Sequence, residues 1–235
     1  MLAKERELGD LKSRFISMAS HEFRTPMSTI LSSMELIERY NERLDAEKKS
    51  KLFNQVRSAI KHMTQLLNDV LIIGKIESGK MEFIPEPTDI ALFCSEIIDE
   101  IGASIGSGHQ LLFTCANPVQ AEVDKKLFRQ VVTNLLTNAI KYSAAGSEVQ
   151  IEIVRKEEAF VFSISDRGIG IPEADQDKLF ETFHRASNVG NISGTGLGMS
   201  IVKNAVELHK GQITFKSAAG GTTFEVLIPL NNTDK

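Results

Sequence analysis

Apolar residues in the first part of the chain recur every three or four positions, first over residues 8–18 and again over 27–37. The second series is rotated by about a third of a turn relative to the first. After a polar break at 41–45, in which Asp45 is a suitable N-cap, a third series runs over 53–70 and ends at Ser78-Gly79. The pattern predicts two helices joined by a short loop.

Such a helical hairpin has more apolar surface than it can bury by itself. We therefore expect two copies of the chain to form a homodimer with a four-helix bundle. The alternative is a monomer in which the hairpin folds onto the rest of the chain.

The pattern changes after Pro85 and Pro87, because two prolines in three residues cannot continue a helix. Beyond them, longer apolar patterns alternate with short strand-like ones. We expect helices over 89–104, 124–142 and 197–209, and strands over 110–115, 121–123, 148–156, 159–165, 211–217 and 221–229. This order predicts an α/β sandwich of the α+β class, with the helices on one face of a mostly antiparallel sheet. The predicted domains are therefore 1–80 and 88–235, with a linker over 81–87.

Composition narrows the class of protein. The 235 residues suffice for two modest domains, and a net charge of −4 gives no indication of nucleic-acid binding. No apolar run reaches the roughly 18–20 residues that a membrane span requires. Cys94 and Cys115 lack metal-ligand spacing and read as buried thiols of a reducing compartment. We expect a cytosolic (cytoplasmic) chain.

His21 lies between the first two apolar series and belongs to neither, so it should face solvent. Glu22 is beside it, and Pro26 removes a backbone N–H and would kink the helix. An exposed imidazole next to a carboxylate is a candidate nucleophile. The simpler alternative is an ordinary polar surface residue.

Asn134, Asn138 and Lys141 share one face of the predicted helix over 124–142. They could be a solvated surface, but asparagine is a poor helix former and two in mid-helix need a reason. An amide oxygen suits Mg²⁺ and a lysine suits phosphate.

Two glycine-containing stretches suit other parts of a nucleotide. The strand over 159–165 leads into Asp166, which can accept a hydrogen bond from the amine of adenine, and Gly168 and Gly170 allow a base to approach the backbone. A simple turn is the alternative, whereas a Rossmann site is excluded because Pro172 and a polar loop follow. Residues 194–198 directly precede a helix, where free amides form an anion site.

The stretch Phe15-Ile-Ser-Met-Ala-Ser-His21-Glu22-Phe-Arg-Thr25-Pro26 resembles the phosphoacceptor box of the sensor histidine kinases of two-component systems. Four further stretches resemble this family's nucleotide boxes: the N box at Asn134–Tyr142, the G1 box at Asp166–Pro172, the F box at Leu179–Phe183 and the G2 box at Gly194–Gly198. Arg167 stands where the G1 box more often has asparagine. In this order the boxes are specific to the family.

The resemblance implies a dimerisation and phosphotransfer hairpin followed by a Bergerat-type domain that binds ATP and Mg²⁺. It implies that His21 is phosphorylated, with Glu22 as the adjacent base, and that Thr25 positions a water for dephosphorylating the regulator. The residues it places on the nucleotide are Asn134, Asn138, Lys141, Tyr142, Asp166, Gly168, Gly170, Gly194, Thr195, Gly196, Leu197 and Gly198, of which Asn138 is also the Mg²⁺ ligand.

The same resemblance implies partners beyond this chain. The phosphoryl group would pass to an aspartate of a response regulator, and a sensor domain is expected upstream, with residues 1–11 as the end of a helical linker from it. Residues 184–195 would be a mobile lid over ATP, with Phe180 and Phe183 as core anchors at its base. His209 is expected to be a dipole partner at a helix C-terminus.

Two other functions share part of these features. One is a Bergerat-fold ATPase of the chaperone, topoisomerase or mismatch-repair type, which would have no reason to carry His21 and Glu22 on a helical hairpin. The other is a dimeric scaffold that binds nucleotide without transferring phosphate.

Overall fold

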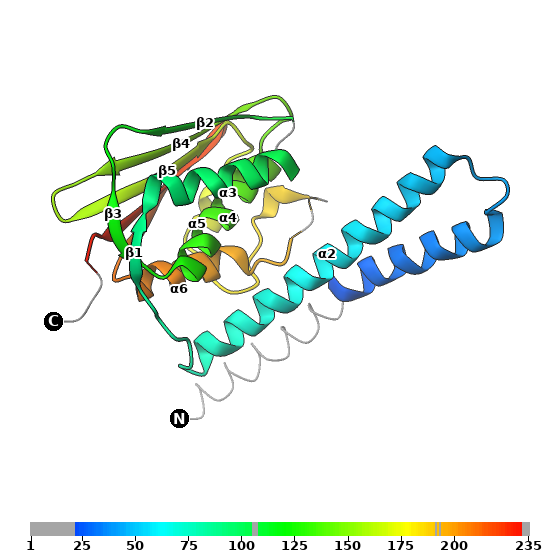
Figure 1. Ribbon diagram of the computed structural model, residues 1–235, viewed down its shortest axis with the longest axis horizontal. Coiled ribbons are helices and arrows are strands. Elements are labelled where there is room, and N and C mark those ends of the chain that lie inside the picture. The colour runs from blue at the N-terminus through cyan, green and yellow to red at the C-terminus, as the bar shows by residue number, and fades with distance from the viewer. Residues whose placement is uncertain (1–21, 105–107, 191, 193, 232–235) are drawn as a thin grey trace. The chain divides into compact units, whose positions relative to one another are not determined.

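The structure of the protein, a computed structural model, describes residues 22–104, 108–190, 192 and 194–231 (Figure 1). The chain divides into two compact units, one up to Lys75 and one from Ile76. His21 lies outside the described residues, so the expectation that it faces solvent is not tested.

The first unit is the predicted helical hairpin. One helix covers residues 22–40 and runs through Pro26 without a break in its helical pattern. The second helix, α2, spans Ala46–Glu77 and begins as predicted after Asp45, whose Oδ1 accepts a hydrogen bond from the Lys48 N–H at 2.8 Å. The two helices lie antiparallel (Figure 1).

The apolar residues of α2 form two separate stripes, each with a spacing of seven residues. Ala59, Leu66 and Ile73 are buried. The second stripe is half exposed, with accessible fractions of 51% at Phe53, 52% at Ile60 and 51% at Leu67. A single chain therefore leaves part of the apolar series over 53–70 exposed, as expected for a hairpin with more apolar surface than it can bury by itself.

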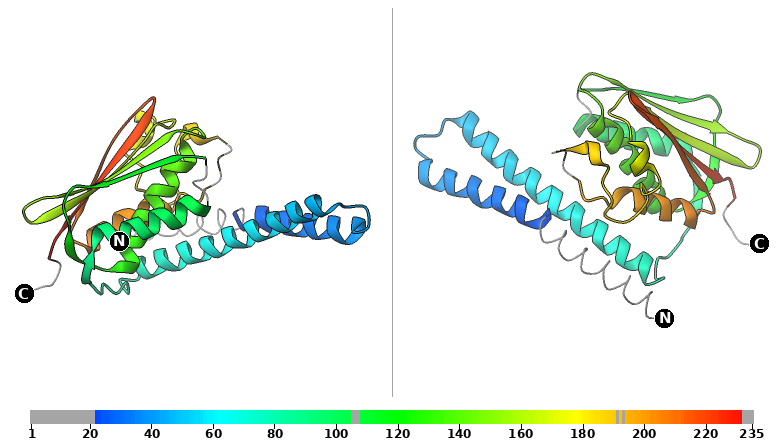
Figure 2. Two further views of the ribbon diagram at one scale, coloured as in Figure 1. Left: turned by 45° about the horizontal axis from the view of Figure 1, so that its top comes forward. Right: turned by 180° about the vertical axis from the view of Figure 1, so that it is seen from behind.

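The second unit is built on a five-stranded sheet in the order β2-β4-β5-β7-β6. Its strands are β2 (Gln110–Cys115), β4 (Glu148–Arg155), β5 (Ala159–Asp166), β6 (Gln212–Ala218) and β7 (Gly221–Pro229). β2 pairs with β4 in parallel, and every other pairing in this sheet is antiparallel. Three helices cover one face (Figures 1 and 2): α3 (Ile90–Ser104), α4 (Lys125–Tyr142) and α6 (Gly198–Leu208).

The core lies between these helices and the sheet. Side chains at alternate strand positions point into it, and at its centre the ring of Phe128 on α4 lies 5.7 Å from that of Phe160 and 6.2 Å from that of Phe162. Every second residue of β4 is buried, at Val149, Ile151 and Ile153. This alternation confirms the predicted α/β sandwich.

Several short elements escaped prediction. β1 (Glu86–Asp89) pairs with β3 (Gln120–Val123) in a separate two-stranded ladder, although Pro87 made the stretch read as a linker. A strand with one neighbour tolerates proline, because it needs only one row of hydrogen bonds. α5 (Glu173–Gln176) and the 3-10 turn η1 (Ser187–Val189) are too short to leave a periodic pattern. No helix in the described ranges is both long and apolar enough to cross a membrane.

Candidate functional site

The polar stripe of α4 faces away from the core. Val131, Leu135 and Ala139, on the adjoining face toward the sheet, are buried as predicted. The Asn134 Nδ2 donates to the Gln130 carbonyl at 2.9 Å, and the Asn138 Nδ2 donates to the Met199 Sδ at 3.4 Å. No described residue donates a hydrogen bond to the Oδ1 atom of Asn138, which leaves this oxygen as an acceptor for a ligand.

The glycine-containing loop before α6 packs directly on this stripe. A Cβ atom at Gly198 would lie 2.7 Å from the Asn134 Oδ1, and one at Gly194 would lie 2.7 Å from the Lys141 Nζ. The fold therefore brings together two predicted boxes that are about 60 residues apart in the sequence.

Backbone geometry fixes the shape of this loop. Gly196 has a φ of +70°, and a Cβ atom there would lie 2.7 Å from the carbonyl carbon of Phe183. The Leu197 N–H donates to the Thr195 Oγ1 at 3.1 Å, and Leu197 itself is buried. Thr195 thus orders the turn into α6, whose first amides are available to bind an anion.

Positive charge collects at the C-terminal end of α4. The Lys141 Nζ donates to the Tyr142 hydroxyl at 3.3 Å and lies 4.8 Å from the centre of that ring. Burial raises the pKa of Tyr142, and the charge of Arg185 opposes this shift. Arg185 was not among the predicted site residues, because nothing in the polar stretch around it indicates that it approaches Tyr142.

The two carboxylate oxygens of Asp166, at the end of β5, have different surroundings. Oδ1 accepts hydrogen bonds from the Gly168 N–H at 2.8 Å and the Thr222 N–H at 3.3 Å. In the part of the chain that the structure describes, no group donates to Oδ2. Burial raises the pKa of Asp166, while the two amide hydrogen bonds oppose this shift. A half-buried acceptor with one open oxygen suits a ligand N–H donor.

The segment after Asp166 is held between α4 and the β6–β7 hairpin. The Ile169 N–H donates to the Tyr142 carbonyl at 3.1 Å, and a Cβ atom at Gly168 would lie 2.6 Å from the same oxygen. Gly170 has a φ of +67°, and a Cβ atom there would lie 2.1 Å from the Ala218 carbonyl oxygen. Only glycine fits at either position, so close backbone packing attaches this predicted box to the end of α4.

The segment that was expected to be a lid is fastened at several points. The Asp175 Oδ2 accepts from the Ser187 N–H at 2.8 Å and from its Oγ at 2.7 Å, which lowers the pKa of Asp175. The Asn188 Nδ2 donates to the Gly170 carbonyl at 2.9 Å. Residues 191 and 193 lie outside the described residues, and the expected mobility stays a prediction. The ring of Phe180 lies 5.9 Å from that of Phe215, and its role as a core anchor stays a prediction.

The predicted residues of the second unit thus converge on one region around the C-terminal half of α4. Glu22 and Thr25 belong to the first unit, where Glu22 is half-buried and Thr25 is exposed. The described residues contain no cluster of three His, Cys, Asp or Glu side chains that could hold a metal. An amide such as that of Asn138 nevertheless suits Mg²⁺, which is usually bound by one or two protein ligands together with substrate phosphates.

Family models match both parts of the chain. Residues 11–79 match the His Kinase A (phospho-acceptor) domain. Residues 123–232 match the family described as Histidine kinase-, DNA gyrase B-, and HSP90-like ATPase.

Curated relatives match along nearly the whole chain. The circadian input-output histidine kinase CikA of Synechococcus elongatus is 31% identical over 235 residues, which covers 97% of this chain and 31% of CikA. The sensor histidine kinase WalK of Bacillus subtilis is 32% identical over 235 residues, which covers 97% of this chain and 38% of WalK. This chain thus spans between about a third and two fifths of the length of these two proteins.

Solved structures share the fold. The mycobacterial sensor histidine kinase MprB is 27% identical with a TM-score of 0.57, covering 61% of this chain and 97% of that one. Histidine kinase ThkA in complex with response regulator protein TrrA has a TM-score of 0.69 at 21% identity, covering 99% of this chain and 66% of that one. The predicted fold class, a helical hairpin followed by an α/β sandwich, is thereby confirmed.

Proposed function

Because the chain belongs to the two-component sensor histidine kinases, we propose that it transfers the γ-phosphoryl group of ATP to His21. The observation that carries this proposal is the convergence of Asp166, the polar stripe of α4 and the loop over 194–198 on one region. Each supplies a different part of a nucleotide site, and they come from separate stretches of sequence.

Adenine is proposed to bind at Asp166, whose open Oδ2 accepts a hydrogen bond from the exocyclic amine. The phosphates are proposed to lie between Lys141 and the first amides of α6, with Asn134 and Tyr142 beside them. The loop at Gly194–Gly198 lies against Asn134 and Lys141, so anion-binding amides and a cation are close together.

Asn138 is proposed to bind Mg²⁺ through Oδ1, because its Nδ2 is already directed to Met199. When bound, the ion would neutralise charge on the phosphates. The neighbouring Lys141 would offset further negative charge.

In the proposed reaction a neutral imidazole nitrogen of His21 attacks the γ-phosphorus, and the bond from that phosphorus to the oxygen of ADP breaks. Glu22, the next residue, would stabilise the positive charge that develops on the ring. The phosphoryl group would then pass to an aspartate of a response regulator. The structure of ThkA with TrrA pairs a histidine kinase with such a regulator.

Thr25 is proposed to serve a second activity, the dephosphorylation of the response regulator. It lies one helical turn after His21, and its exposed hydroxyl could hold a water in line with a phosphoaspartate. We further propose that the chain is the cytosolic part of a longer sensor.

Incubation with γ-labelled ATP and Mg²⁺ tests the phosphotransfer. We expect label that is stable in base and labile in acid, and its loss in His21→Gln. Release of phosphate without labelled protein would favour an ATPase of the chaperone or topoisomerase type, and nucleotide binding without either would favour a scaffold. Adding a phosphorylated regulator to Thr25→Ala tests the phosphatase role, which a fully active variant would contradict.

We also propose that the hairpin forms a homodimer. In a single chain, Leu31 is 62% exposed and Leu71 is 55% exposed. The stripe of Phe53, Ile60 and Leu67 on α2 is also half exposed. Large apolar residues that recur at exposed positions along both helices indicate a protein interface. A second copy would present the same stripes and complete the four-helix bundle.

A further inference from the structure

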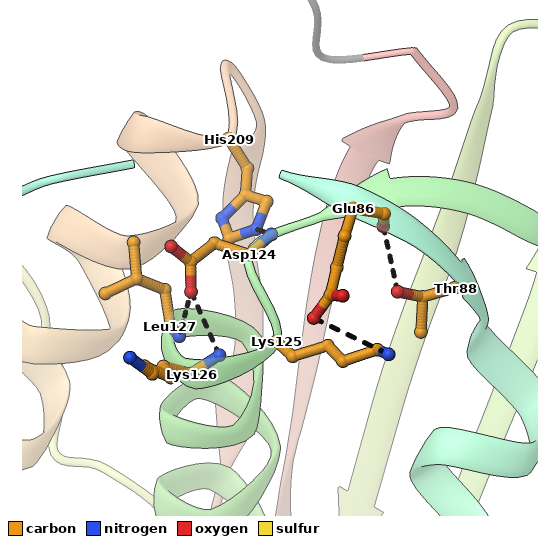
Figure 3. A network of polar contacts seen from close by, with 7 residues as sticks. All are labelled: Glu86, Thr88, Asp124, Lys125, Lys126, Leu127 and His209. Atoms are coloured by element: carbon orange, nitrogen blue, oxygen red, sulfur yellow. Dashed lines mark hydrogen bonds and ion pairs between the residues drawn. The ribbon is translucent and has the colours of Figure 1, made fainter. Parts of the chain in front are cut away.

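Asp124 joins three parts of the second unit at the N-terminal end of α4. Figure 3 shows its contacts with the first turn of α4 and with His209. Its Oδ1 accepts from the N–H groups of Lys126 at 2.9 Å and Leu127 at 3.1 Å, which caps the helix. Its Oδ2 accepts from the Ile84 N–H at 2.9 Å. Ile84 is 63% exposed, so the hydrogen bond of its backbone, rather than burial of its side chain, holds it there.

His209 fastens α6 to the same point. It is fully buried, its Nε2 lies 3.1 Å from the Asp124 backbone nitrogen, and its Nδ1 lies 2.7 Å from the Ala205 carbonyl oxygen. Because a backbone N–H can only donate, Nε2 must accept, and the ring proton must be on Nδ1. The neutral tautomer is therefore the one that satisfies both contacts, and the ring of Phe83 packs edge-on against it at 4.9 Å. His209 lies at the C-terminal end of α6 as expected, and burial lowers its pKa, which favours the neutral ring.

These contacts lie far from the proposed nucleotide site but on the same two helices. Asn138 follows Asp124 by 14 residues along α4, which corresponds to roughly 20 Å of helix. Residues 83 and 84 belong to the segment that connects α2 to β1. The segment that leads to the hairpin is thus attached where the N-terminal end of α4 meets the C-terminal end of α6.

We propose that Asp124 and His209 are positioning residues for phosphotransfer, which fasten the segment at Phe83 and Ile84 to the two helices of the nucleotide site. The inference rests on the proposed function. Met81 and Phe83 also pack against the core of the second unit, so fastening at Ile84 keeps the connection from α2 short. A longer or looser tether lowers the effective concentration of ATP at the phosphoacceptor without changing how ATP binds.

Asp124→Asn is a selective test. Asparagine retains a single side-chain oxygen. In one orientation of the amide this oxygen accepts from the N–H groups of Lys126 and Leu127, and in the flipped orientation it accepts only from the Ile84 N–H. The capping orientation is therefore favoured, and it places an NH2 group against the Ile84 N–H. Asp89→Asn is the matched control, because Asp89 accepts from the Leu92 N–H at 3.0 Å and, through its other oxygen, from the Gln120 Nε2 at 3.0 Å.

The measurement is autophosphorylation of the whole chain at varied ATP concentration, together with hydrogen exchange of the Ile84 amide. For Asp124→Asn we expect kcat to fall by roughly 10- to 100-fold, the loss typical of misplaced reactants, with KM for ATP nearly unchanged. The Ile84 amide should exchange faster. Asp89→Asn should retain both the rate and the exchange protection of Ile84.

A second pair of variants covers the case in which Asp124→Asn unfolds. His209→Gln can still accept from the Asp124 N–H and should retain its rate, whereas His209→Leu cannot and should lose kcat. Faster exchange at Ile84 with an unchanged kcat, or equal losses of kcat and ATP affinity, would overturn the positioning role. If the wild-type chain itself took up no label from ATP, the proposed function would be contradicted instead.

Discussion

At the residue scale, Asp166 shows how one side chain can serve the fold and a ligand separately. Oδ1 is committed to the Gly168 and Thr222 amides, and Oδ2 has no donor within the described chain. Asp166→Asn can retain the first oxygen while placing an NH2 group at the second, where it would meet the amine of adenine.

We therefore expect Asp166→Asn to lower ATP affinity by between roughly 10- and 100-fold, the value of a hydrogen bond to a charged acceptor, with little change in stability. Calorimetric titration of ATP and a thermal unfolding curve would measure the two effects. An unchanged affinity would exclude Asp166 as the adenine contact, and a large loss of stability would mean that the substitution tests the fold instead.

Asn138 can be tested in the same way. Asn138→Ala should remove the part of the ATP affinity that depends on Mg²⁺, so that titrations with and without the ion give nearly the same affinity. Met199→Leu is the control, because it removes the sulfur contact of the amide and leaves Oδ1 in place. A variant Asn138→Ala that still responds to Mg²⁺ as the wild type does would reject the metal role.

At the element scale, the junction between the lid segment and α6 depends on Gly196. Alanine there would need both a positive φ and a Cβ atom 2.7 Å from the Phe183 carbonyl carbon. Gly196→Ala should therefore displace the loop over 194–198 and abolish measurable ATP binding. Gly190→Ala is the control, since Gly190 also has a positive φ, of +50°, but no atom within 4 Å of its Cβ position. Equal ATP affinities for the two variants would show that the close approach is unimportant.

The contact of His209 with the Asp124 N–H, which links α6 to α4, makes the free energy of unfolding depend on pH. Burial lowers the pKa of His209 from the usual 6.5, so the unfolded chain binds the proton more tightly than the folded one. His209 therefore contributes its full stabilisation above about pH 6.5, and this contribution is lost as the pH falls below that value. The slope from one such group cannot exceed about 1.4 kcal/mol per pH unit.

Denaturant unfolding of the second unit between about pH 7.5 and 5.5, a range that spans the histidine pKa, would measure this slope. His209→Gln retains the acceptor but does not titrate, and we expect a flatter dependence for it. Parallel curves for the variant and the wild type would show that His209 does not titrate in this range.

The elements were predictable where local pattern decides and not where distant residues decide. Val149, Ile151 and Ile153 alternate within one strand, and Asp45 begins α2 by accepting a hydrogen bond from a backbone N–H of its first turn. The glycine boxes could also be found locally, because each needs a backbone shape that the sequence shows. Other features could not be found in this way, since their partners come from distant parts of the chain: the parallel pairing of β2 with β4, the effect of the Arg185 charge on Tyr142, and the contacts of His209.

At the scale of the whole molecule, the hairpin shows why an apolar pattern alone does not identify its partner. The periodicity of α2 is correct, but it includes two stripes, and only Ala59, Leu66 and Ile73 are buried within one chain. Phe53, Ile60 and Leu67 follow the same seven-residue spacing and remain half exposed. A second stripe at coiled-coil spacing is best explained by helices from another copy.

Leu31→Glu tests this interface. In a two-fold symmetric bundle the substitution would bury two unpaired carboxylates, so we expect the dimer to weaken by at least roughly 100-fold. Leu92→Glu is the control, because Leu92 is equally exposed, at 59% against 62%, but lies on α3 in the other unit. Sedimentation should give a monomer for Leu31→Glu and a dimer for Leu92→Glu. Both should bind ATP as the wild type does, since every predicted nucleotide contact of the second unit comes from a single chain. A dimeric Leu31→Glu would place the interface elsewhere, and a monomeric variant that also loses ATP binding would show that the nucleotide site itself requires the partner.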